Sequence, residues 1–135
     1  MSLSHLALYG LTALVFFAID LVWLGLVATD FYQRHLGHLM RPDVQWVPAL
    51  VFYALYIAGI LVFAVLPGLE AGSLARAAGL GAFFGLVAYA TFDLTSMALF
   101  RDFPLVTVVV DLAWGTVLTA SVASAGWGIG RWLGL

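Results

Sequence analysis

The sequence predicts an all-α fold, a polytopic integral membrane protein built as a bundle of four transmembrane helices, with residues 1–135 forming a single domain. Hydrophobic residues make up 64% of the chain and charged residues 9%, whereas a soluble domain carries about 45–50% and about 25%. The apolar residues also form four runs, each near the roughly 20 residues that a helix needs to cross a bilayer. Because these runs are long and continuous rather than alternating, they favour helices over barrel strands.

The first span is expected at residues 6–28, and the longest polar connection follows it at residues 29–45. Within this connection, residues 31–40 mix apolar and basic side chains. Two interpretations fit that pattern. The segment either lies on the membrane surface as an interfacial element, or it extends the first helix and exposes one face to solvent.

The other three spans are bounded by residues that favour turns. The second span is expected at residues 46–66, with Pro48 in its first turn, where a missing N–H costs little, and Pro67-Gly68 at its end. The third span is expected at residues 74–99 and the fourth at residues 104–126. Because the connection between them is very short, these two spans should form an antiparallel hairpin.

Charge and composition exclude several function classes. The net charge is −2, whereas nucleic-acid binding needs a basic patch, so we expect no nucleic-acid partner. The lack of cysteine excludes disulfides, thiolate metal sites and cysteine nucleophiles. His35 and His38 are weak candidates for a metal site, because two histidines do not complete a coordination shell. We therefore expect no metal and no cofactor.

Three aspartates lie inside the expected spans, where each costs about 2.5–3.5 kcal/mol to insert. Asp20, Asp93 and Asp111 are displaced from the middle of their spans by about 5, 10 and 6 Å. Because the fourth span runs opposite to the first and third, all three displacements point to the same leaflet. Three tyrosines and two tryptophans lie on the same helix faces as these aspartates or at a similar depth in the membrane. The candidate functional polar cluster is therefore Asp20, Asp93, Asp111, Tyr53, Tyr56, Tyr89, Trp23 and Trp114.

A structural interpretation of the same residues stays open. An intramembrane aspartate can be a buried acceptor that holds helices together, with a tyrosine, tryptophan or threonine as donor. On the third span, Gly81 and Gly85 are four residues apart, which lets another helix approach closely, so they are predicted helix-packing positions. The sequence assigns no catalytic residue.

Several strings in the chain resemble one family of small bacterial membrane proteins. They are IDLVWLG at residues 19–25, DFY at 30–32, HLGHL at 35–39, YATFDLT at 89–95 and VDLAWGT at 110–116. The chain resembles the bacterial domain-of-unknown-function family 2177, small predicted four-span inner-membrane proteins. This resemblance implies a multi-pass protein of the bacterial inner (plasma) membrane without a settled activity. Its members also resemble products of genes near fatty-acid-modifying enzymes, which implies a link to lipid chemistry.

Three functions fit these observations. The acidic and tyrosine layer suits proton- or cation-linked transport, which in so small a protein requires a homo-oligomer or a larger membrane assembly. The alternatives are a membrane-embedded lipid- or fatty-acid-modifying enzyme or accessory subunit, in which the acids do acid–base work, and a non-catalytic structural subunit of a membrane complex. We favour transport over catalysis, with membrane lipids as the surrounding partners.

Overall fold

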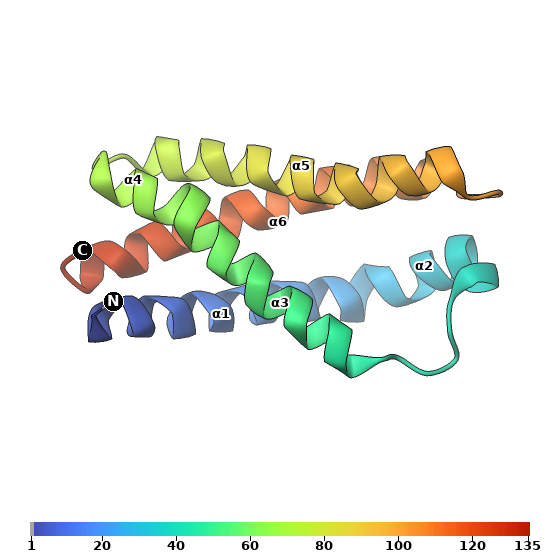
Figure 1. Ribbon diagram of the computed structural model, residues 1–135, viewed down its shortest axis with the longest axis horizontal. Coiled ribbons are helices and arrows are strands. Elements are labelled where there is room, and N and C mark those ends of the chain that lie inside the picture. Colours follow the sequence, from blue (N-terminus) through green and yellow to red (C-terminus); the bar gives the residue numbers. More distant parts are fainter. Residues whose placement is uncertain (1) are drawn as a thin grey trace.

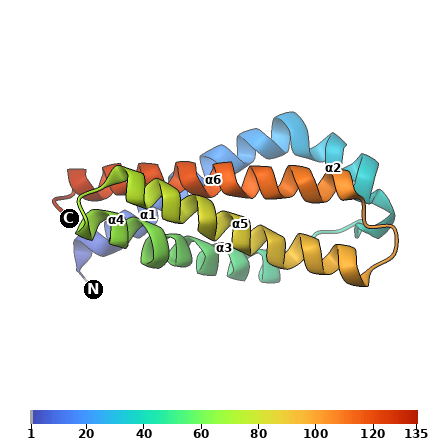
Figure 2. The same ribbon diagram turned by 90° about the horizontal axis from the view of Figure 1, so that it is seen from above.

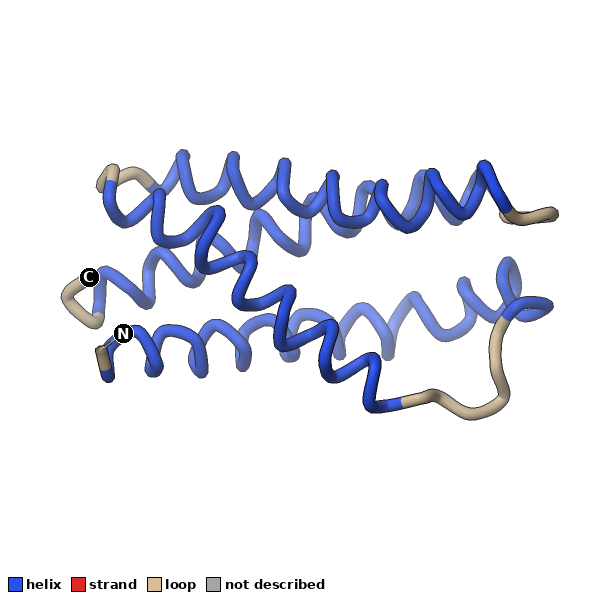
Figure 3. Tube along the Cα trace, in the orientation of Figure 1, coloured by secondary structure: helices blue, strands red, loops and turns tan. Residues whose placement is uncertain are grey.

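A computed structural model describes residues 2–135, and every secondary-structure element in that range is helical (Figure 1). Four helices, some of them divided by irregular turns, are long and apolar enough to cross a membrane. The predicted all-α bundle of four membrane-spanning helices is therefore confirmed. The non-helical connections lie at the two ends of the bundle (Figure 3).

The first span is longer than the sequence indicated. Helix α1 (Leu3–Trp23) continues through a π-helical turn, η1 (Leu24–Ala28), into α2 (Thr29–Leu36), before a 3-10 turn, η2 (Gly37–Leu39). The N-terminal segment of the expected connection is thus an extension of the first helix, the second of the two interpretations. Arg34 and His35 in the last turn of α2 suit the negative end of the helix dipole, which favours a helix that extends to Leu36.

The second span also passes the point where it was expected to end. It comprises α3 (Trp46–Ile60), the π-helical turn η3 (Leu61–Val65) and α4 (Leu66–Glu70). Pro67 does not stop the helix, because the wider turn just before it makes room for a ring that would clash with the backbone of a regular α-helix. The chain instead reverses at Gly72, whose φ of 62° suits glycine.

The third and fourth spans form the predicted antiparallel hairpin. Helices α5 (Leu74–Leu99) and α6 (Leu105–Trp132) lie side by side along most of their length (Figure 2). A Cβ atom added at Gly81 would lie 2.6 Å from Ala123 Cβ, and one at Gly85 would overlap the carbonyl oxygen of Gly115. Both glycines therefore allow α5 to contact α6 within the same chain, so this face is not free for a second copy.

The packed core occupies the half of the bundle that contains the two termini. Its buried residues include Leu8 and Phe16 of α1, Ile57 and Ile60 of α3 and Leu118 of α6. The first half of α3 contributes no buried residue and diverges from α5 towards its Trp46 end (Figure 1). The opposite half of the bundle is therefore more open, and its outward apolar side chains suit contact with lipid.

Candidate functional site

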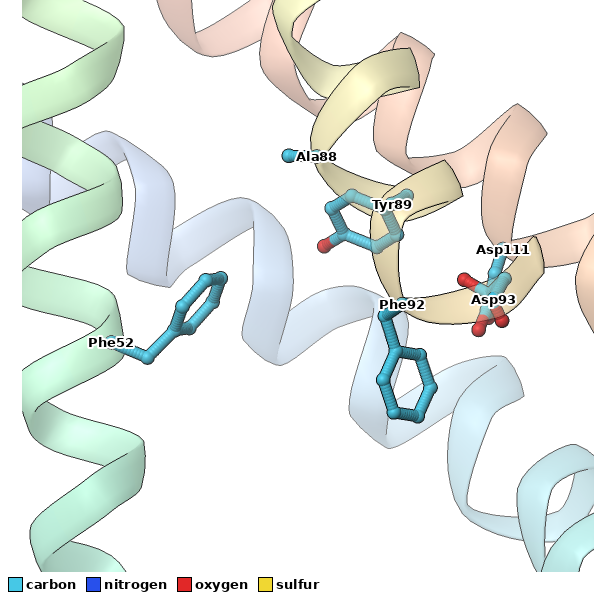
Figure 4. A pocket seen from close by; sticks show the side chains of 6 residues that line it. All are labelled: Phe52, Ala88, Tyr89, Phe92, Asp93 and Asp111. Atoms are coloured by element: carbon cyan, nitrogen blue, oxygen red, sulfur yellow. The ribbon is translucent and has the colours of Figure 1, made fainter. Parts of the chain in front are cut away.

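The α5–α6 interface brings two of the predicted aspartates together. The contacts of Gly81 and Gly85 with α6 set an antiparallel register in which Tyr89 packs on Gly115. One turn further along α5, Asp93 faces Asp111, and the two carboxyl groups lie beside each other (Figure 4). Asp93 is 0% exposed and Asp111 7% exposed, so both carboxyl groups are removed from solvent.

A third polar group joins this pair from the first span. The hydroxyl of Tyr32, on α2, donates a hydrogen bond to Asp111 Oδ1. Tyr32 is not in the candidate cluster predicted from the sequence, because the first span was expected to end at residue 28 and the extension of its helix was only one of two interpretations of the residues that follow. The signal that could have found it is the lack of a helix-breaking residue between Gly25 and Gly37.

The buried Asp93 carboxyl group accepts no hydrogen bond in the described chain. Both of its carboxyl oxygens are buried without a partner, and so is the hydroxyl oxygen of Thr107, one turn before Asp111 on α6. A buried polar group without a partner costs about 1–3 kcal/mol, and more when charged. Two adjacent carboxyl groups satisfy each other when they hold one proton between them, since the protonated group donates to the ionised one.

A cavity of about 420 Å³ reaches these carboxyl groups from the side of the bundle. Its walls are Phe52 on α3 and Ala88, Tyr89 and Phe92 on α5, with Asp93 and Asp111 at one end (Figure 4). Phe52 is 48% exposed and Phe92 59% exposed, so the cavity has its rim on the outer surface of the bundle. The arrangement combines an apolar, aromatic wall with a polar end.

The match to a family model covers residues 5–128, and that family is described as a predicted membrane protein, DUF2177. The chain belongs to this family. The resemblance seen in the sequence is thereby confirmed, as is the assignment to a membrane protein with four candidate spans. No curated protein and no solved structure matches the chain.

Of the other predicted polar residues of this DUF2177 protein, Tyr89 lines the cavity beside the carboxyl pair, whereas Asp20, Tyr53 and Tyr56 have other partners. Asp20 of α1 is placed next to Tyr53 of α3. The hydroxyl of Tyr56 lies 2.6 Å from Thr119 Oγ1, a contact between α3 and α6. The hydrogen bonds and close contacts of the predicted cluster thus form an Asp93–Asp111–Tyr32 group, an Asp20–Tyr53 pair and a Tyr56–Thr119 pair, and Tyr89 lies beside the first of them.

The two predicted tryptophans pack on each other. The indole rings of Trp23 and Trp114 stack with centroids 4.2 Å apart and an interplanar angle of 8°. This contact holds the end of α1 against α6, where it supports the approach of α2 to Asp111.

The two candidate metal ligands contact backbone carbonyls instead of each other. His35 Nδ1 lies 2.9 Å from the carbonyl oxygen of Phe31, and His38 Nε2 lies 3.2 Å from that of Asp102. Within residues 2–135, no group of three or more histidine, aspartate or glutamate side chains is placed to hold a metal ion. The second contact connects the end of the first span to the α5–α6 turn.

Proposed function

We propose that this DUF2177 protein performs proton- or cation-linked transport, with Asp93 and Asp111 as the group that exchanges a proton. The observation that carries the proposal is the pair of adjacent buried carboxyl groups, one of which has no protein donor for either oxygen. A structural aspartate would be expected to accept hydrogen bonds from its neighbours. Intramembrane acids without such partners are typical of proton and ion pathways.

The geometry supports one arrangement of the proton. The Asp93 carboxyl carries it and donates to the Asp111 carboxylate, which also accepts the Tyr32 hydrogen. The pair then has a net charge of −1. When the proton leaves, the second negative charge is balanced by a cation that takes its place, so that proton and cation compete for one site.

The position of the pair suits exchange with one side of the membrane. Asp93 lies six residues before the end of α5, and Asp111 six residues after the start of α6. At 1.5 Å per residue, each lies about 9 Å from the α5–α6 turn. A proton therefore has a short path to water on that side, whereas transport requires a rearrangement that opens the other side.

We also propose that the protein lies in a bacterial inner membrane. Spanning helices, rather than a barrel, are the form that proteins of this membrane take. We propose that the protein works as a homo-oligomer or within a larger assembly, because the four helices of one chain enclose a cavity at their side rather than a path across the membrane. Native mass spectrometry of the gently extracted protein measures the number of copies.

The test uses reconstituted protein in liposomes with an imposed pH gradient and an internal pH-sensitive dye. Addition of sodium, potassium or tetramethylammonium ions should dissipate the gradient faster with the wild type than with Asp93→Asn or Asp111→Asn. Asp43→Asn is the matched control, because Asp43 is an exposed acid in the connection before α3. Equal rates for all variants and for protein-free liposomes would overturn the proposal.

An infrared measurement separates the proton-exchanging role from a purely structural one. The wild type should have a protonated carboxyl band near neutral pH that is lost in Asp93→Asn and kept in Asp43→Asn. If Asp93→Asn and Asp111→Asn fold normally and keep full activity, the pair only holds α5 against α6, which is the structural interpretation.

A further inference from the structure

We propose that the cavity between α3 and α5 binds a monovalent organic cation with apolar substituents, which enters from the bilayer. This inference rests on the proposed function and names the class of its substrate. The cation would be the species that replaces the proton of the Asp93–Asp111 pair.

The walls of the cavity suit an organic cation better than a metal ion. Three of its six lining residues, Phe52, Tyr89 and Phe92, are aromatic. Aromatic rings attract cations at their faces, as in sites for quaternary ammonium groups. Magnesium and calcium need a shell of protein oxygens or retained water around them, whereas most of the wall of this cavity is apolar or aromatic. An organic cation needs no such shell, because it carries little water to replace.

Charge selects against the other amphiphiles of a membrane. An anionic headgroup would be repelled by the carboxyl pair, and a neutral acyl chain has no charge with which to replace the proton that leaves. A single positive charge placed at the polar end of the cavity compensates the negative charge that appears when the proton leaves. The substituents of the cation then contact the phenyl rings and Ala88.

The size and position of the cavity suit entry from lipid. Its volume of about 420 Å³ lies in the range of small-molecule sites, about 300–1,000 Å³. Phe52 and Phe92 form a rim on a surface that is apolar around it. A second cavity of about 340 Å³ also has Phe92 in its wall, together with Phe100 and Leu39 at the end of the bundle.

The test measures equilibrium binding of labelled tetraphenylphosphonium to the full-length protein in a neutral detergent. Tetraphenylborate is the matched control ligand, because it has nearly the same shape with the opposite charge. We expect binding of the cation and no saturable binding of the anion. Asp93→Asn should weaken cation binding by about tenfold or more, because it removes the group that becomes charged, and Asp43→Asn should leave it unchanged.

A second variant keeps the test independent of the folding of Asp93→Asn. Phe92→Leu leaves both carboxyl groups in place and removes one aromatic face at the exposed rim. It should weaken cation binding by about 2–10-fold without changing the infrared band of the protonated carboxyl. Saturable binding of both ions with equal affinity, or cation binding that is unchanged in Asp93→Asn and Phe92→Leu, would overturn the inference.

Proton release distinguishes this inference from the proposed function. In a weakly buffered solution, binding of the cation to the wild type should release about one proton for each cation bound. Binding without release would retain the cavity as a cation site and contradict the proton-exchanging role. If small cations dissipate the pH gradient while tetraphenylphosphonium does not bind, the proposed function stands and this substrate class is wrong.

Discussion

At the scale of single residues, the Tyr32 hydroxyl connects the first span to the carboxyl pair. We predict that Tyr32→Phe lowers the free energy of unfolding by about 1–3 kcal/mol, because a buried carboxyl group loses its donor. Unfolding by titration with a denaturing detergent, followed by circular dichroism, measures the change.

Tyr9→Phe is the matched control for this variant. The Tyr9 hydroxyl donates to the carbonyl oxygen of Ala54 at 2.9 Å, so the same atom is removed from a bond between uncharged groups. Such bonds between membrane helices average about 0.6 kcal/mol. Equal losses for the two variants would contradict a role for Tyr32 in satisfying a charged partner.

The residue pattern predicted part of this site. The positions of Asp93 and Asp111 along the third and fourth spans predicted a similar depth in the membrane. A tight hairpin brings such positions face to face. Depth also placed Asp20 level with Tyr53, and the two lie together. Depth alone could not predict which members of the cluster pair with each other, because the rotation of the first helix depends on packing around Phe16 and Trp23. Tyr32 lay outside the prediction because its helix was expected to end earlier.

At the scale of the elements, close contact of α5 with α6 places the two carboxyl groups together. We predict that Gly85→Ala lowers the free energy of unfolding by about 1–3 kcal/mol, because the added Cβ would overlap the Gly115 carbonyl oxygen and lie 2.6 Å from Thr119 Oγ1. The hairpin would have to separate, which should also weaken the infrared band of the shared proton.

Gly79→Ala tests the same substitution where α5 has free space. No atom outside its own helix lies within 4 Å of the position of its Cβ. Alanine should therefore stabilise the helix here by about 0.5–1 kcal/mol. If Gly85→Ala is as stable as Gly79→Ala, the two helices are not in the close contact that the site requires.

The ends of the elements were harder to predict than their existence. All four spans follow from hydrophobic run length alone, and the short connection after Leu99 determined the hairpin. The helix ends at Leu36 and Glu70 could not be predicted from run length, because two π-helical turns let the helices continue beyond Ala28 and through Pro67. Such turns are settled by packing rather than by local residue preference.

At the scale of the whole molecule, all the side chains of the proposed site belong to one chain. The walls come from α3 and α5, the carboxyl groups from α5 and α6, and the hydroxyl donor from α2. The face of α5 that contains Gly81 and Gly85 is already covered by α6. That face is therefore not available for a contact between copies.

This arrangement predicts the stoichiometry of cation binding. Native mass spectrometry with saturating tetraphenylphosphonium should record one bound cation per chain, whatever the number of chains in the assembly. The bound mass should disappear in Asp93→Asn and persist in Asp43→Asn, with the same number of chains in both. Half a cation per chain would contradict a site complete within one chain, because two copies would then share one cation. In that case the exposed rim at Phe52 and Phe92 would be the first surface to examine as a contact between copies.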